Sequence, residues 1–499
     1  MSPITGRDVD KSHVDEVEKR DLSNGSIDVD DHHMTRKILW KLDTRLVSLF
    51  TVTGKIQPPP PCSYRSLLGS KPMWAMPDCD YGLEKDTNMT DKQYDQGLAV
   101  FYATYIVSEI PSNLVMKRVS PQKWLPFLTF AWGLVAMCLG FVQNFAGFVA
   151  VRAILGATEG GLLPGMILYL SGIYKREELA LRIGLFYTAA SLSGAFGGLL
   201  ARGLSEIGSR GGLSSWRWIF VIEGLLTTIV AVAVYFILPN GLADAKFLTP
   251  EEREYALRRV HGSGHGDSIH ERESHEKFSW SEVRRGFFSF LTWSTAIAYF
   301  GILAGLYSFG LFLPTIIAAL GYTSNEAQLW SVIPYAAAAV VTVIVAILSD
   351  RLRVRGIIML FTLPIAIIGY AAIANTTNAR VKYGMTFLMA TGLYSSVPPV
   401  LGWLSNNSAG HYKRATTSAL QLAIANAGGF VTVFVYPKSQ GPQYHEGHTI
   451  ILGLLVAGWF FILASVLYCS KVNKDKANGK YDQFIGSGDD RDPTFKLVM

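Results

Sequence analysis

The feature that most constrains this chain is a succession of eleven apolar runs, each long enough to cross a lipid bilayer. A membrane-spanning helix needs about 20 mostly apolar residues. The approximate limits of the runs are 96–116, 124–142, 145–172, 181–202, 218–238, 288–314, 329–348, 356–374, 383–404, 415–436 and 447–469. Helices that are apolar on all sides are typical of membrane spans. The sequence therefore predicts an all-α membrane protein.

Composition excludes several other classes of protein. Charged residues make up 17% of the chain, against about 25% in a soluble domain. The net charge of +6 comes with no basic stripe interleaved with aromatic residues, so we expect no nucleic-acid partner. Neither a nucleophile with a general base nor a Gly-rich phosphate loop with a lysine is visible. This argues against an enzyme and against an ATP-driven pump.

A polar loop divides the apolar runs into two groups. It contains FLTPEEREYALRRV, whose Glu and Arg spacing predicts a short amphipathic helix on the membrane surface. The predicted divisions are a disordered cytoplasmic tail (1–37), an anomalous first-helix region (38–95), an N-terminal helical half (96–238), a central cytoplasmic loop (239–286), a C-terminal helical half (287–469) and a cytoplasmic tail (470–499).

Lys and Arg are unequally distributed between the two sets of alternate loops. Cytoplasmic loops carry the excess of these residues. One set carries eleven of them and the other carries six. The first set, the central loop and the lysine-containing C-terminal tail are therefore predicted to lie in the cytoplasm. We expect the plasma membrane as the location and a monomer as the working unit.

The region before residue 96 does not fit this pattern. Two six-helix halves require another helix here, but the apolar core Leu46–Val52 is far shorter than a span. Four prolines, Pro58–Pro61, then prevent a helix from continuing. One interpretation is a polyproline ligand for a partner domain. The other is that residues 53–80 are not native coding sequence, which sequencing of the transcript would test.

Several runs together resemble the major facilitator superfamily, and within it the fungal anion:cation symporters that include allantoate and high-affinity nicotinic acid permeases. The matching runs are TDKQYDQGLAVFYATYIVSEIPSNLVMKR (90–118), RAILGATEGGLLPG (152–165), GAFGGLLA (194–201), SSWRWIFVIEGLLT (214–227), FLTPEERE (247–254) and LSDRLRVRG (348–356). The resemblance covers about residues 80–499. It implies a major facilitator fold of two six-helix halves. The first helix is degenerate or missing here, because the Asp-Arg pair and the Asn-Ile-Gly-Asn stretch of family members are absent.

Two opposite charges, Arg152 and Glu159, interrupt the apolar run Phe145–Leu170. Seven residues apart, they share one face of a helix, about 10 Å apart along its axis. Ionisable groups at that depth are costly and usually face a cavity or a partner. They resemble the pair with which relatives bind a substrate and a proton. We therefore expect Arg152 to bind an anion and Glu159 to carry the coupled proton; the alternative is a static clamp between helices.

Three more residues are predicted to bind substrate. Tyr105 and Tyr307 match positions that face the central cavity in relatives, and Asn426 is a polar group in an apolar helix. The alternatives are core or lipid-facing packing for the tyrosines and an interhelical hydrogen bond for the asparagine. Glu109 and Glu223 recur in family runs and are predicted to be structural, paired with loop bases or with backbone near helix ends.

The resemblance also implies a loop motif that connects neighbouring helix ends through charges during the conformational cycle. Its clear copy is in the second half, where Asp350, Arg351, Arg353 and Arg355 occur together. In the first-half copy, Lys117 stands where an Asp is usual. The alternative is that these residues only supply the positive charge of a cytoplasmic loop.

These residues together predict a secondary active transporter that takes up a small organic anion, such as a carboxylate or a nicotinate-like vitamin, with protons. We expect no cofactor, because a proton gradient supplies the energy. No metal is expected either, since the histidines of the central loop have the setting of a solvated loop. The rival functions are export of a secondary metabolite, and a non-transporting receptor or inactive relic.

Overall fold

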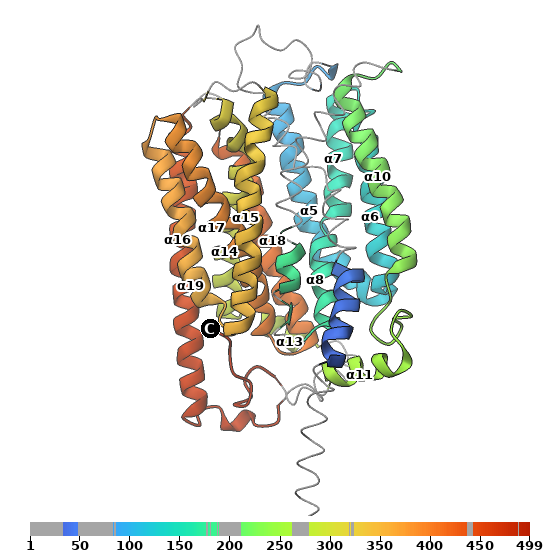
Figure 1. Cartoon of the computed structure of the whole chain (residues 1–499), viewed down its shortest axis with the longest axis vertical. Coiled ribbons are helices and arrows are strands. Elements are labelled where there is room, and N and C mark those ends of the chain that lie inside the picture. Colours follow the sequence, from blue (N-terminus) through green and yellow to red (C-terminus); the bar gives the residue numbers. More distant parts are fainter. Residues whose placement is uncertain are drawn as a thin grey trace, which may run out of the picture.

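Long helices that run between two ends of the molecule make up the structure (Figure 1). This computed structural model describes residues 33–47, 83, 86–175, 178–179, 181–186, 188, 211–261, 279–318, 320, 324–436, 443–487 and 489–499. Within these residues, eight stretches are long and apolar enough to cross a membrane. The end drawn at the bottom of Figure 1, where the chain also ends, is called the lower end below.

The N-terminal half contains five of the described helices. They are α5 (Asp91–Val119), α6 (Pro121–Leu139), α7 (Phe145–Glu159), α8 (Leu162–Ile173) and α10 (Ser215–Ile237). Thr90 begins α5 with a capping box, in which its side chain and that of Gln93 satisfy each other's backbone N–H groups. Helix α5 packs against α7, and α6 packs against α10. Most of the predicted span 181–202 lies outside the described residues.

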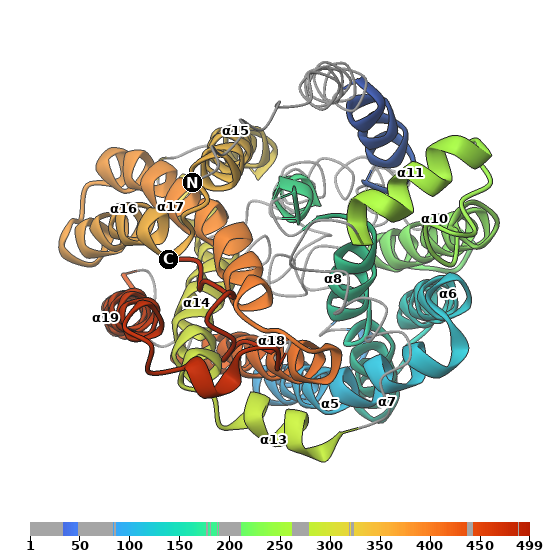
Figure 2. The same ribbon diagram turned by 90° about the horizontal axis from the view of Figure 1, so that it is seen from below.

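The C-terminal half is described almost completely. Its helices are α13 (Trp280–Phe287), α14 (Phe290–Ala318), α15 (Ser324–Leu352), α16 (Gly356–Asn375), α17 (Ala379–Asn406), α18 (His411–Val435) and α19 (His445–Ala477). The view from below shows the two halves meeting where α18 lies beside α5 (Figure 2). The predicted runs of this half all coincide with helices, so the all-α membrane fold is confirmed.

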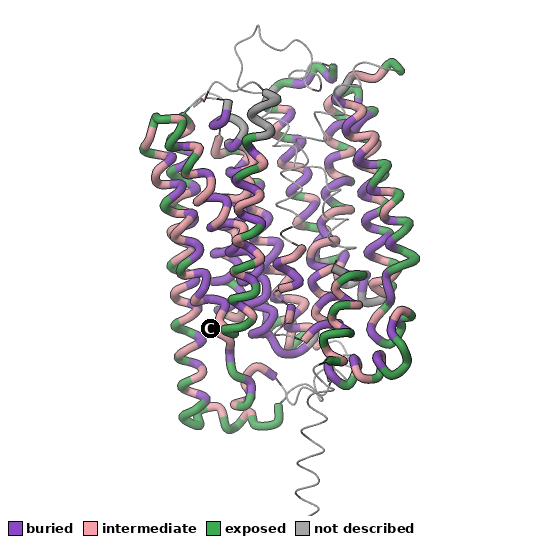
Figure 3. The backbone as a smooth tube through the Cα atoms, viewed as in Figure 1, coloured by how far each residue is buried: buried purple, intermediate pink, exposed green. Residues whose placement is uncertain are grey.

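Burial distinguishes central helices from peripheral ones. In α17, 78% of the most apolar window is buried, against 33% in α10 and 28% in α19. Exposed residues follow the outer side of α10 in Figure 3, and they include Ile229 and Phe236. Apolar residues exposed in this way along a span are suited to lipid. The polar chemistry of the protein must therefore be sought between the halves.

A helix at residues 33–47 lies at the lower end beside α11 (Pro250–His261), as Figure 1 shows. Lys41 donates to Glu252 of α11 at 2.7 Å, and the Thr35 and Tyr255 hydroxyls are 2.8 Å apart. The amphipathic helix expected in the central loop is thus present, and it contacts both the N-terminal helix and, through the 2.7 Å ion pair of Arg259 with Glu178, the N-terminal half. Residues 53–80 and most of the loop histidines lie outside the described residues.

The last eleven residues, 489–499, pack under the C-terminal half and are called the C-terminal segment. Asn407 exchanges two hydrogen bonds with the backbone of Val498. Asn473 does the same with Leu497. The buried ammonium of Lys476 donates to the carbonyl oxygens of Asp490, Asp492 and Phe495. The charged composition of this region predicted a tail, whereas the structure shows a docked segment.

Candidate functional site

The charged helix α7 lies unusually close to α5. A Cβ atom at Gly156 would be 2.3 Å from the carbonyl oxygen of Phe101, and one at Gly160 would be 2.4 Å from that of Tyr105. Neither position can carry a side chain without moving a backbone. Small residues four apart permit this close approach between membrane helices. The glycines therefore fix the position of Glu159, the last residue of α7, against α5.

Arg152 is buried within α7, with 2% of its surface exposed. Its guanidinium carbon lies 5.0 Å from the centre of the Phe148 ring, a distance at which a cation is attracted to the ring face. The Phe148 ring in turn stacks on Tyr94 of α5 at 5.6 Å. The structure therefore places a permanent positive charge inside the N-terminal half, one turn from Gly156.

Glu159 accepts a hydrogen bond from the indole N–H of Trp132 on α6, at 3.1 Å. Trp132 is 2% exposed and belongs to a set of buried residues from α5, α6 and α7. We call this set the central cluster; its members are Phe101, Tyr102, Tyr105, Trp132, Ala136 and Leu155. The tryptophan thus connects the carboxyl group to an aromatic surface at the middle of the protein.

Besides Arg152, three residues were predicted to bind substrate, and all three lie on or beside this cluster. Tyr105 is a member of it. The hydroxyl of Tyr307 on α14 donates to the amide oxygen of Asn426 on α18 at 3.3 Å. The ring of Tyr102 meets Tyr307 edge-to-face, with centres 5.6 Å apart. Tyr102 therefore joins the two halves, and sequence reasoning missed it because an aromatic residue in an apolar helix has no distinguishing pattern.

Glu109 on α5 has an unexpected environment. It is completely buried, and neither carboxyl oxygen has a hydrogen-bond partner among the described residues. The Asn426 side chain is a polar neighbour of this carboxyl group. The prediction that Glu109 pairs with a loop base or with backbone is therefore wrong for the described part of the chain. Glu223, on α10, is also buried.

The second-half loop motif connects the two halves at the lower end. Asp350 pairs with Arg355 at 3.2 Å and accepts the backbone N–H of Leu181, from the N-terminal half, at 2.7 Å. The backbone N–H of Arg355 donates to Met499 of the C-terminal segment at 2.6 Å. Burial lowers the pKa of the Arg355 guanidinium, and Asp350 opposes that shift. This buried arginine therefore depends on its carboxylate.

The other motif residues contribute less to this contact. Arg351 and Arg353 are exposed, and Arg353 has a backbone φ of 54°, which is the left-handed region needed for the tight turn between α15 and α16. Lys117 is in the last turn of α5, but its side chain falls outside the described residues. Within the part of the chain that is described, no three His, Cys, Asp or Glu residues converge as metal ligands would.

Long apolar helices in two groups, with polar and aromatic side chains in contact where the groups meet, define a polytopic membrane protein. Comparison with known families agrees with this class. The Major Facilitator Superfamily model matches residues 75–433. The chain belongs to this superfamily and is a membrane transporter of its type.

Similar proteins and structures support the assignment. The chain is 35% identical to an uncharacterized transporter of Schizosaccharomyces pombe, covering 84% of this chain and 83% of that protein. It is 30% identical to the high-affinity nicotinic acid transporter of Saccharomyces cerevisiae, covering 84% and 78%. The partially occluded inward-open xylose transporter XylE from E. coli has the same fold, with a TM-score of 0.61 at 13% identity, covering 85% of this chain and 98% of XylE.

Proposed function

We propose that the protein takes up a small organic anion together with a proton, and that the anion is a carboxylate of the nicotinate type. The proton gradient supplies the energy, so the chain needs no cofactor for this cycle. The relative that transports nicotinic acid, at 30% identity, suggests the first substrate to examine.

The observation that carries the proposal is the placement of Arg152 and Glu159 on one helix, α7, with Arg152 over the Phe148 ring and Glu159 bonded to Trp132 of the central cluster. Arg152 is buried and keeps its charge at every physiological pH, and its fork of N–H donors matches a carboxylate. Glu159 holds a carboxyl group at the edge of the same region, where Trp132 orients it. The anion binds to the first group and the proton to the second.

The central cluster suits the uncharged part of such a substrate. The rings of Tyr102, Tyr105 and Tyr307 lie close together, and aromatic rings attract one another in edge-to-face or offset stacks. Asn426, which accepts from Tyr307, offers an amide group that can hydrogen-bond a ring nitrogen or a second oxygen. The cluster lies between the halves, as expected for a site that opens to each side in turn.

The lower end faces the cytoplasm in this proposal, because its loops carry the excess of Lys and Arg. There the contact of Asp350 with Arg355 and with the Leu181 backbone holds the two halves together. Transport requires this contact to break when the site opens to the cytoplasm and to form again when the site opens outward. Rocking of one half against the other provides the alternation.

Uptake by purified protein in liposomes tests the proposal. Vesicles with an acidic exterior and a neutral interior are given labelled nicotinate, benzoate, lactate or allantoate in separate assays. At least one carboxylate should accumulate, and a protonophore should abolish that accumulation. Arg152→Gln should lose it, whereas the exposed control Arg351→Gln should retain most of it. Accumulation that resists the protonophore, or that survives Arg152→Gln unchanged, contradicts the proposal.

A further inference from the structure

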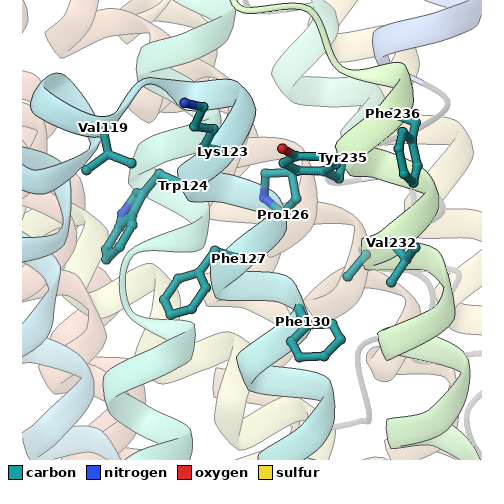
Figure 4. A pocket seen from close by; sticks show the side chains of 10 residues that line it. Val119, Lys123, Trp124, Pro126, Phe127, Phe130, Val232, Tyr235 and Phe236 are labelled. Carbon is teal, nitrogen blue, oxygen red and sulfur yellow. The ribbon is translucent and has the colours of Figure 1, made fainter.

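A groove on the outer surface of the N-terminal half has no role in the proposed transport cycle. It has a volume of about 540 Å³, within the ~300–1,000 Å³ range of pockets that bind small ligands. Helices α6 and α10 form its walls, with Val119 at the end of α5 (Figure 4). The groove extends from Lys123 at one end to Phe130 at the other (Figure 4).

The groove follows from the side chains along the two helices. Pro126 within α6 has no backbone N–H, so the carbonyl of Gln122 lacks its helical hydrogen bond. The small Ala231 of α10, 1% exposed, lies at the bottom. Larger side chains surround Pro126 and Ala231 and form the rim of the groove. Two of them, Phe127 and Tyr235, are 56% and 45% exposed. An apolar channel therefore opens sideways, toward the place of the lipid.

Lys123 is the one charged residue among those that line the groove. Its ammonium has no hydrogen-bond or ion-pair partner within the described part of the chain. Helix α6 begins at Pro121 with no acidic residue in its first turn. The apolar channel thus ends at a positively charged rim. Trp124 and Tyr235, which also line the groove, have the amphipathic rings that favour the membrane interface.

We propose that this groove binds an anionic phospholipid, with one acyl chain in the channel and the phosphate at Lys123. A molecule that fills the site must be long and apolar, must enter from the bilayer, and must carry negative charge at one end. Phospholipids with acidic head groups combine these properties, and basic pockets between membrane helices are known to bind them. Only the choice of the cytoplasmic leaflet rests on the proposed orientation of the protein.

The bound lipid would connect α6 to α10 in the lower third of the N-terminal half. These helices pack directly through Gly133 and Gly224, where an added Cβ would approach the facing helix within 2.8 Å and 2.5 Å. Toward the start of α6 the groove lies along the outer side of this pair, where an acyl chain would contact side chains of both helices. Occupancy of the groove should therefore stabilise the purified protein against heat.

Native mass spectrometry of the detergent-solubilised full chain tests the proposal. Phosphatidylserine and phosphatidylcholine with identical acyl chains are offered in equal amounts, and inorganic phosphate is offered separately. The wild-type protein should retain about five times as much phosphatidylserine as phosphatidylcholine. This ratio is expected for one lysine near the head group. Inorganic phosphate should neither bind measurably nor displace the lipid.

Variants separate the head-group contact from the channel. Lys123→Gln should abolish the preference between the two lipids, while Lys246→Gln, an exposed lysine outside the groove, should leave it unchanged. Val232→Trp fills the channel and should reduce retention of both lipids. Phosphatidylserine should also raise the melting temperature of the wild type more than that of Lys123→Gln. Equal retention of both lipids by the wild type, equal effects of the two lysine substitutions, or displacement of lipid by inorganic phosphate would overturn the proposal.

Discussion

Trp132 donates its indole N–H to the carboxyl group of Glu159, and the two residues lie on neighbouring helices at 3.1 Å. The tryptophan ring is packed into the central cluster, so the hydrogen bond transmits the position of that cluster to the carboxyl group. A change in the packing of the cluster when substrate binds would therefore move the indole N–H and alter its hydrogen bond to Glu159.

Trp132→Phe should reduce proton-driven uptake by about tenfold, because it removes the N–H donor and preserves most of the ring. A hydrogen bond to a charged group contributes about 1.5–3 kcal/mol, and ~1.4 kcal/mol corresponds to a factor of ten. The measurement is the initial rate of carboxylate uptake into liposomes. Trp124→Phe is the matched control, since Trp124 is on the same helix and donates to the neutral Ser112 hydroxyl. Equal losses in the two variants would show that Trp132 acts through packing alone.

Asp350→Asn should destabilise the protein by about 3–5 kcal/mol, because it leaves the buried Arg355 without its carboxylate. It should also loosen the lower end, because the carboxylate accepts from the Leu181 backbone and from Arg355 with different oxygens, whereas an amide has only one acceptor oxygen. The measurements are thermal unfolding in detergent and the labelling rate of a cysteine introduced at Leu181, a half-buried position that bonds Asp350 through its backbone only. Arg351→Gln should change neither. Unchanged labelling in Asp350→Asn would show that the motif does not hold the halves together.

The contact between the N-terminal helix and α11 should depend on pH. Burial raises the pKa of Glu252, but hydrogen bonds from Lys41, the Thr249 backbone and Lys37 outweigh it and lower the pKa to about 2. Because the folded-state pKa is below the usual value of 4.5, this stabilisation is complete above that value and is lost as the pH falls from about 4.5 toward 2.

Limited proteolysis reports on this contact. Pepsin, which is active at low pH, should cleave within residues 33–47 of the wild type faster as the pH falls from about 4.5 toward 2. At pH 7, trypsin should cleave after Lys41 faster in Glu252→Gln than in the wild type. Glu251→Gln, at the exposed neighbouring position, is the control. Cleavage of Glu252→Gln that matches the wild type at pH 7 would contradict the assignment.

The docked C-terminal segment should contribute measurably to stability. Asn407→Ala removes both hydrogen bonds to Val498, which should cost about 1–3 kcal/mol and lower the melting temperature. Asn478→Ala, at an exposed position after α19, serves as the control. Deletion of residues 489–499 removes all three carbonyl acceptors of Lys476 and should also lower the melting temperature. An unchanged melting temperature would show that the segment does not stabilise the C-terminal half.

The sequence predicted the helices well because each apolar run is long and bounded by polar residues. It also predicted that Arg152 and Glu159 share a helix, since spacing along α7 determines this. It did not predict Trp132 or Tyr102, whose roles depend on which helices become neighbours. The docking of Asn407 and Asn473 onto the C-terminal segment was missed for a similar reason. A charged tail has the same composition whether it is solvated or bound, and only the fold shows the buried acceptors of Lys476.

We propose that Glu159 carries the proton that drives uptake. The most direct measurement compares proton-driven accumulation with substrate exchange in liposomes that contain the Glu159→Gln variant. Exchange of labelled for unlabelled carboxylate needs binding and the conformational change but no net proton movement. Glu159→Gln should retain exchange and lose accumulation under an imposed pH gradient. Full accumulation by this variant would contradict it.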